Sequence, residues 1–258
     1  MSLTLGTAPF SSKRRGVLNS RIEGPAHLLY FEPYERRMRA VTGGEAVIDT
    51  TRGMLLYESN IPPVLYVPQE DVRADLLTRT DHTTHCPFKG DATYWSVGDA
   101  ENAIWGYEEP IESASWLRGY VAPYWDRFEW YEEGERLHTK LRDPYHRIDV
   151  RETDARVTVR AGGEVVAESD RARLLFETGI APRAYVPLDD VREELLVPSD
   201  KQTVCPYKGT ASYWSVNGAT DAAWSYRDPI PEAGAIEGLV SFDGDGVEVE
   251  ITRPRSSR

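Results

Sequence analysis

The chain has 258 residues, of which 40% are hydrophobic and 28% are charged, an ordinary composition for a globular protein. Seven Trp and fourteen Tyr supply ample apolar surface for a core, so the composition excludes wholesale disorder. The formal net charge of −12 argues against nucleic acid or an anionic membrane surface as the main partner.

The sequence shows no pattern typical of membrane insertion or export. Its apolar runs fall well short of the ~20 residues that cross a bilayer. The basic residues Lys13, Arg14 and Arg15 are not followed by an apolar segment, so we expect no signal peptide. We therefore expect a cytoplasmic protein without a nucleic-acid or membrane partner.

A long internal repeat dominates the sequence. Shifted by 119 residues, Cys86–Val97 aligns without a gap on Cys205–Val216, with nine identities in twelve positions. Such a match indicates two copies of one domain. We assign residues 1–30 to an N-terminal arm without a counterpart, residues 31–138 to the first copy and residues 139–254 to the second. The polar stretch Glu132–His146 lies at the junction.

Both copies read as mainly β in chain order. Alternating apolar and polar residues flank Gly43-Gly44 and Gly162-Gly163, which predicts a hairpin over residues 38–49 and again over 156–168. Further predicted elements are short strands over 55–58, 64–67, 94–97, 103–107, 174–177, 183–186 and 246–251, and one or two helical turns over 71–77 and 190–196. Because the βαβ alternation of a nucleotide-binding sheet is absent, we predict a small antiparallel, barrel-like domain used twice, with one short helix per copy.

The cysteine content is low, with only Cys86 and Cys205 present. This number excludes a zinc site of three or four cysteines within one chain, and we expect reduced thiols rather than a Cys86–Cys205 bridge. Each cysteine opens a Cys-Pro-x-Lys-Gly motif. The charge of Lys89 or Lys208 could favour a reactive thiolate there; the alternative is a structural turn with the lysine in water.

Aromatic residues recur at matching positions in both copies. Each copy has a Tyr-Trp pair, a lone Trp and a Tyr two residues later, and strand alternation sends the two residues of the pair to opposite faces. These residues form either the core of a small β domain or an aromatic pocket for a ligand. The predicted ligand-binding residues are Glu58, Tyr66, Cys86, Lys89, Tyr94, Trp95, Trp105 and Tyr107, with their counterparts Glu177, Tyr185, Cys205, Lys208, Tyr213, Trp214, Trp224 and Tyr226.

Several charged residues are also shared by the two copies. Glu58 and Glu177 follow apolar strand residues, so we expect them to be partly buried against Lys89 and Lys208. Asp71 and Asp190 suit a helix cap. Arg73 and Arg192 suit pairing with nearby carboxylates more than binding of phosphate.

Metal and nucleotide motifs are weak in this sequence. His82, His85 and Cys86 have the spacing of metal ligands, but the second copy has Lys201, Val204 and Cys205 at those positions. There is no Walker-type loop and no G-x-G-x-x-G. Asp49 with Asp71, or Asp91 with Asp99, could supply Mg²⁺ ligands for nucleotidyl transfer, yet Thr210 replaces Asp91 in the second copy. We expect no metal and no cofactor, and we assign no catalytic residue.

The repeated motifs resemble the domain-of-unknown-function 427 family. The residues that carry the resemblance are Tyr66-Val-Pro68, Cys86-Pro-Phe-Lys-Gly90, Tyr94-Trp-Ser96, Trp105 and Tyr107-Glu-Glu-Pro110, with their counterparts 119 residues later. The chain looks like the two-domain version found in bacteria. The resemblance implies a compact antiparallel fold similar to the β-tent arrangement, and the family also carries a nucleotidyltransferase label. Many β-tent proteins hold zinc with two C-x-x-C pairs, which this chain lacks.

Three functions remain open at this stage. The leading hypothesis is a protein that binds a small molecule in a pocket of each copy, lined by Tyr66, Lys89, Trp95, Trp105 and Tyr107 or their counterparts. The second is an enzyme, either nucleotidyltransferase-like or dependent on the cysteine. The third is a protein-interaction scaffold, which would expose an apolar patch larger than ~400 Å².

Overall fold

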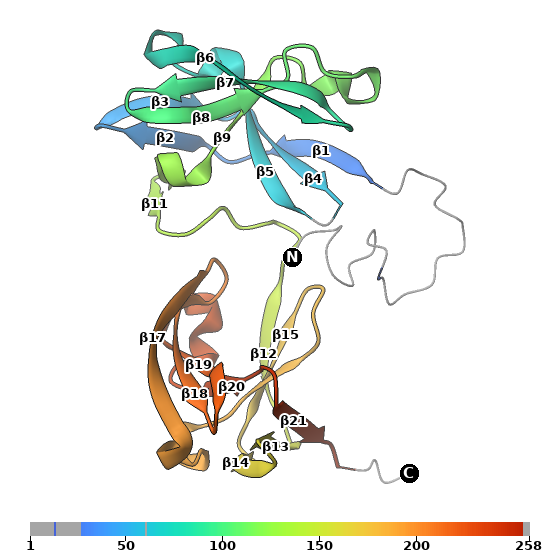
Figure 1. Cartoon of the computed structure of the whole chain (residues 1–258), viewed down its shortest axis with the longest axis vertical. Helices are drawn as coiled ribbons and strands as arrows, with labels where there is room; N and C mark the ends of the chain where they lie inside the picture. Colours follow the sequence, from blue (N-terminus) through green and yellow to red (C-terminus); the bar gives the residue numbers. More distant parts are fainter. Residues whose placement is uncertain (1–12, 14–26, 60, 255–258) are drawn as a thin grey trace. The chain divides into compact units, whose positions relative to one another are not determined.

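The computed structural model describes residues 13, 27–59 and 61–254. Most of the predicted arm therefore lies outside the described residues. The chain forms two compact units, residues 1–140 and 141–258, drawn from blue to green and from yellow to red in Figure 1. No helix in the described part of the chain is long and apolar enough to cross a membrane.

The first unit consists of two antiparallel sheets. Seven strands form the larger sheet in the order β1-β4-β5-β9-β8-β7-β6, and four form the smaller one in the order β11-β10-β2-β3. The strands are β1 (Leu29–Tyr34), β2 (Met38–Thr42), β3 (Glu45–Thr50), β4 (Gly53–Glu58), β5 (Ile61–Pro68), β6 (Leu77–Cys86), β7 (Gly90–Val97), β8 (Ala100–Gly106), β9 (Tyr120–Pro123), β10 (Glu129–Glu132) and β11 (Glu135–Leu137).

The second unit repeats this arrangement. Its sheets have the orders β12-β15-β16, β17-β18-β19-β20 and β14-β13-β21, and Val186 and Val240 exchange two backbone hydrogen bonds of 2.8 Å that join the first two sheets. The strands are β12 (Ile148–Glu152), β13 (Arg156–Ala161), β14 (Glu164–Ser169), β15 (Arg173–Glu177), β16 (Arg183–Tyr185), β17 (Leu196–Cys205), β18 (Gly209–Val216), β19 (Ala219–Pro229), β20 (Val240–Phe242) and β21 (Val247–Thr252). The predicted mainly β fold in two tandem copies is confirmed; the sheets are open rather than closed barrels, which agrees with a tent-like arrangement.

The short helical segments are 3₁₀ helices. The turns predicted over 71–77 and 190–196 are each split in two, as η1 (Gln69–Asp71) and η2 (Ala74–Leu76), and as η5 (Leu188–Asp190) and η6 (Glu193–Leu195). The split arises because Val72 is extended and bridges to Ile48, which interrupts a continuous helix. Outside the predicted elements lie η3 (Glu112–Leu117), η4 (Trp125–Arg127) and η7 (Pro231–Ile236).

In the second unit, the joined sheets of β12-β15-β16 and β17-β18-β19-β20 contribute buried residues from both faces. One face packs on the β13–β14 hairpin through a cluster that includes Val157, Val166 and Leu174. The other face packs under η7 through a cluster that includes Leu175, Tyr185 and Ile236. Neighbouring residues such as Leu174 and Leu175 therefore enter different cores, as the two-residue period of a strand requires.

The glycine of the Cys-Pro-x-Lys-Gly motif is required by its backbone. Gly90 and Gly209 have φ values of +106° and +105°, a region that side chains other than glycine rarely adopt. A Cβ at Gly90 would also lie 3.3 Å from the carbonyl oxygen of Glu109, and one at Gly209 would lie 3.2 Å from that of Asp228. The motif is thus a tight turn packed against the chain that leads into η3 or η7.

We expect Gly90→Ala to destabilise the first unit by about 1–3 kcal/mol, because the substitution adds both backbone strain and a close contact. Urea unfolding of the full chain measures the change. Gly134→Ala is the matched control, since a Cβ at Gly134 meets no atom within 4 Å, and we expect it to be nearly neutral. Equal midpoints for the two variants would contradict the requirement for glycine.

Candidate functional site

Three charged or titratable side chains converge at one corner of the larger sheet. In the first unit they are Glu58 at the end of β4, Lys89 in the turn between β6 and β7, and His27 two residues before β1. Strand β1 pairs with β4 so that Leu29 lies opposite Glu58, and this register brings His27 beside the carboxylate. The second unit builds the same group from Glu177, Lys208 and His146; we call each the His–Glu–Lys cluster.

The glutamate of each cluster uses both carboxylate oxygens. His27 Nε2 lies 2.7 Å from Glu58 Oε1, while Lys89 Nζ contacts Glu58 Oε2. In the second unit, Glu177 lies 2.9 Å from His146 Nε2 and 2.6 Å from Lys208 Nζ. The expected burial of the Glu–Lys pairs is confirmed, because the Glu58 and Lys89 side chains are each 9% exposed. Each charge of such a pair offsets the desolvation cost of the other, so removal of either one leaves a buried charge without its partner.

The histidine is fixed by stacking and by the backbone next to it. The His27 ring lies 3.9 Å from the Phe88 ring at an interplanar angle of 14°, and the His146 ring lies 3.8 Å from that of Tyr207. The next residue in each copy donates its backbone N–H over 2.9 Å to a hydroxyl, Leu28 to Ser59 and Arg147 to Thr178. The histidine therefore belongs to the folded domain and not to an appended arm.

In the second cluster, burial and the neighbouring groups have opposite effects on the pKa of Glu177. Burial alone would raise the pKa of Glu177, but the hydrogen bond with His146 and the charge of Lys208 outweigh it, so the pKa lies below its usual range. The Glu177 carboxylate is thus held ionised at neutral pH.

Tyr207, whose ring lies against His146, is also affected by burial. Burial raises the pKa of Tyr207 to about 12 and outweighs the lowering effect of the hydrogen bond that its hydroxyl accepts from the Asp143 N–H over 2.7 Å.

The lowered pKa of Glu177 makes a prediction about pH. A carboxylate whose pKa is lower in the folded state stabilises the fold above its unfolded pKa, and that contribution disappears as the pH falls through the folded pKa. We expect the stability contributed by Glu177 to be intact at pH 7 and to decline below about pH 4.5, the ordinary value. Urea unfolding between pH 7 and pH 3 measures it. The acid-dependent loss should be smaller in Glu177→Gln; an unchanged profile would contradict the assignment.

The aromatic residues predicted for the site lie next to the charged cluster. Tyr66, Tyr94 and Tyr107 are buried in one hydrophobic cluster under η3, with Cys86 and Trp105 half-buried against it. Lys89 Nζ lies 6.0 Å from the centre of the Tyr107 ring, and the Tyr66 and Trp105 rings lie 6.5 Å apart, edge to face. Burial raises the pKa of both Tyr66 and Tyr107. The structure therefore brings these five residues together with Glu58 and Lys89.

The second unit gathers the counterparts in the same way. Tyr185, Tyr226, Tyr213, Trp224 and Cys205 share the cluster under η7. The Tyr185 side chain is fully buried next to the Trp224 indole. It therefore belongs to the buried wall behind the half-buried Trp224 and Cys205.

The tryptophan of each Tyr-Trp pair lies elsewhere. Trp214 packs in the cluster between the two sheets, on the face opposite Tyr213, because neighbouring residues of β18 alternate. Trp95 follows Tyr94 in the same way on β7 and is itself buried. The predicted opposite orientation of the pair is confirmed, but Trp95 and Trp214 do not share a pocket with the other predicted residues.

The histidines are the site residues that the sequence analysis missed. His27 was assigned to an arm without a counterpart, and His146 to the junction between the copies. The structure corrects the assignment of His27, because β1 begins at Leu29 and His27 occupies the place equivalent to His146, which lies within the predicted second copy. A signal was present, since Pro25-x-His27 and Pro144-x-His146 are themselves 119 residues apart.

The candidates for metal or nucleotide chemistry are dispersed. His85 pairs with Asp91 at 2.6 Å, and the His82 ring lies against Tyr94. Asp71 accepts a hydrogen bond from Thr50 and pairs with Arg52, while Asp49 pairs with Arg37. As expected, Arg73 and Arg192 pair with carboxylates, those of Asp75 and Glu194. Over residues 27–59 and 61–254, no three His, Cys, Asp or Glu side chains form a group that could hold a metal ion.

Two tandem antiparallel domains, each with a buried His–Glu–Lys cluster beside aromatic residues and a free cysteine, define the class of this protein. The sequence profile of the family described as Domain of unknown function (DUF427) matches residues 30–134 and again residues 149–253. The chain therefore belongs to this family and contains two copies of its domain. No protein among curated sequences shows significant similarity to the chain.

Proposed function

We propose that each unit binds a small organic molecule at the half-buried edge of the aromatic cluster. The supporting observation is that both copies have the same arrangement. In each unit, buried tyrosines and a Glu–Lys ion pair lie on the inner side, and a tryptophan and a cysteine are half-buried at the accessible edge. Small-molecule sites are commonly apolar with a few well-placed polar groups. Trp105 and Cys86, or Trp224 and Cys205, are the groups that a ligand would meet first.

The accessible edge indicates the shape of such a ligand. Trp224 is half-buried there and offers an aromatic surface near the Cys205 thiol. A flat molecule can stack on this indole. The edge therefore favours a planar metabolite.

The test is a thermal-shift screen of nucleotides and cationic metabolites on the full chain, followed by titration of any compound that stabilises it. We expect binding to be weakened about tenfold or more by Trp224→Ala or Trp105→Ala, the loss of a stacking surface. Trp214→Phe is the matched control, because Trp214 lies in the other core and its replacement should preserve affinity.

A second readout uses the cysteines. A ligand at this edge should slow alkylation of Cys86 and Cys205 by iodoacetamide, since both thiols are half-buried beside the tryptophans. A stabilising compound whose affinity is the same in Trp105→Ala, Trp224→Ala and Trp214→Phe, and which leaves alkylation unchanged, would overturn the proposed site.

A cysteine-dependent reaction is the second candidate, and the half-buried position of Cys86 at the start of the Cys-Pro-x-Lys-Gly turn favours it. The thiolate is the nucleophilic form of cysteine. This candidate requires native Cys86 to alkylate faster than a model thiol. Alkylation slower than that of the model thiol would remove the candidate.

A further inference from the structure

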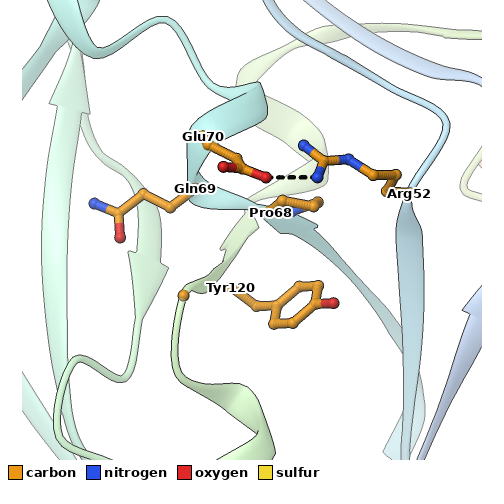
Figure 2. A pocket seen from close by; sticks show the side chains of 6 residues that line it. Arg52, Pro68, Gln69, Glu70 and Tyr120 are labelled. Atoms are coloured by element: carbon orange, nitrogen blue, oxygen red, sulfur yellow. Dashed lines mark hydrogen bonds and ion pairs between the residues drawn. The ribbon is translucent and has the colours of Figure 1, made fainter.

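A separate cleft of about 600 Å³ opens on the first unit, away from the His–Glu–Lys cluster (Figure 2). It lies where β5 ends in η1 and where the chain enters β9, and the backbone N–H of Gln69 joins these segments by donating to the Gly119 carbonyl over 2.8 Å. The lining residues are Arg52, Pro68, Gln69, Glu70, Gly119 and Tyr120.

An aromatic stack supports one wall of the cleft. Figure 2 shows the Tyr120 ring below Pro68, whereas the Gln69 side chain points the other way. Phe31 packs edge-on against Tyr120 at 5.3 Å, and Trp116 stacks on Phe31 at 4.9 Å. The second copy has aliphatic residues at these three positions, Val150, Ala235 and Leu239. The aromatic wall is thus a specific feature of the first unit.

The polar side of the cleft is rich in acceptors. Arg52 pairs with both Asp71 and Glu70, the latter at 2.5 Å, so one guanidinium faces two carboxylates. Asp71 is 17% exposed and is also held by the Thr50 hydroxyl at 2.6 Å, whereas Glu70 is 70% exposed. Together with Asp71, which lies outside the lining, this group carries one net negative charge, and Glu70 is its exposed carboxylate in the lining.

We propose that this cleft binds an organic ammonium ion, a protonated amine with an apolar or aromatic body. The ammonium group lies against the exposed carboxylate of Glu70, and the body lies on the ring of Tyr120. Cations are attracted by aromatic faces and by carboxylates, and the net charge of −12 also favours their approach. An anion would have to displace Glu70 from Arg52 and would meet two carboxylates there.

The second copy supplies the variant for the test, because its domain carries Leu239 in place of Tyr120. Tyr120→Leu should therefore fold while losing the aromatic surface. Glu70→Gln removes the exposed charge and leaves Asp71 to hold Arg52. The probe is 2-phenylethylamine, and its binding to the full chain is measured by ligand-observed NMR and by calorimetry. The neutral analogue 2-phenylethanol and the anionic analogue phenylacetate serve as controls.

We expect saturable binding of 2-phenylethylamine at one site per chain, weakened about fivefold by Tyr120→Leu and about threefold by Glu70→Gln. Binding should be unaffected by Trp224→Ala, which removes the indole of the proposed site in the second unit, where Leu239 replaces Tyr120. Tighter binding of phenylacetate, equal binding of 2-phenylethanol, or amine binding that is non-saturable or unchanged in both variants would overturn the proposal.

Discussion

Replacing Glu177 by Gln should destabilise the second unit by about 3–5 kcal/mol at neutral pH, the usual cost of removing one member of a buried ion pair. The carboxylate receives hydrogen bonds from His146 at 2.9 Å and Lys208 at 2.6 Å, and the amide of Gln has a single acceptor oxygen for these two donors. Its NH₂ group would face the second donor. The Lys208 ammonium would then stay buried without an opposite charge.

Urea unfolding of the full chain measures this loss. Glu168→Gln is the matched control, because Glu168 is 50% exposed and pairs only at the surface with Arg156, so its replacement should cost under about 1 kcal/mol. Adding Lys208→Met to Glu177→Gln removes the stranded charge, and we expect the double variant to lose less than the two single changes together. A cost for Glu177→Gln as small as that of the control would contradict a buried, interdependent cluster.

The same substitution in the first unit provides a graded comparison. His27 is 18% exposed, whereas His146 is 1% exposed, so water can solvate part of the first cluster when its carboxylate is removed. Glu58→Gln should therefore cost less than Glu177→Gln. A reversed order would mean that burial of the histidine does not set the energetics of the cluster.

The strongest local patterns in the sequence did predict the fold. Gly162 and Gly163 turn the β13–β14 hairpin with φ values of +57° and +81°, and beyond a register shift Val159 lies opposite Ala167 on the buried face. The predicted final strand is β21, an edge strand paired with β13. Apolar and polar residues alternate along these strands, and this two-residue period is what predicts a strand from the sequence.

Elements without a buried face escaped prediction. Strand β6 reads Leu-Thr-Arg-Thr-Asp-His-Thr-Thr-His-Cys at the edge of the larger sheet, and seven of its ten residues are exposed while none is buried. Its pairing with β7 is also interrupted between Arg79 and Thr83. Strand β11 lies within the polar stretch Glu132–His146 that the sequence places at the junction between the copies, and it pairs with β10, which ends where this stretch begins. Neither strand has an apolar period that could reveal it.

The candidate site was predictable where duplication and chemistry coincide. Glu58 and Lys89 are charges retained in both copies near apolar residues, and their pairing follows from the cost of burying either alone. His27 lies 31 residues from Glu58 in sequence, and only the pairing of β1 with β4 brings them together. Trp95 is the opposite case. It is adjacent to Tyr94 in the sequence, but alternation along β7 places its side chain on the other face of the sheet.

The short 3₁₀ helices that cover the aromatic cluster should be as important for stability as the ion pairs. Leu117 in η3 and Ile236 in η7 are fully buried and pack in the same clusters as Tyr66 and Tyr185. A segment of six residues has little intrinsic helical stability, so its position depends on such anchors. We expect Ile236→Ala to cost about 2–5 kcal/mol through lost burial and the cavity left behind.

Urea unfolding followed by tryptophan fluorescence tests this expectation, and near-ultraviolet circular dichroism reports the environment of the site tyrosines. Ile111→Ala is the control, because Ile111 precedes η3 but is 37% exposed and contributes little buried area. If the unfolding midpoint of Ile236→Ala equals that of the control and the tyrosine signal stays native, Ile236 does not anchor η7 on the aromatic cluster. If the stability and the tyrosine signal fall together, η7 and the aromatic cluster form one cooperative unit, because the tyrosines then depend on the helix for their packing.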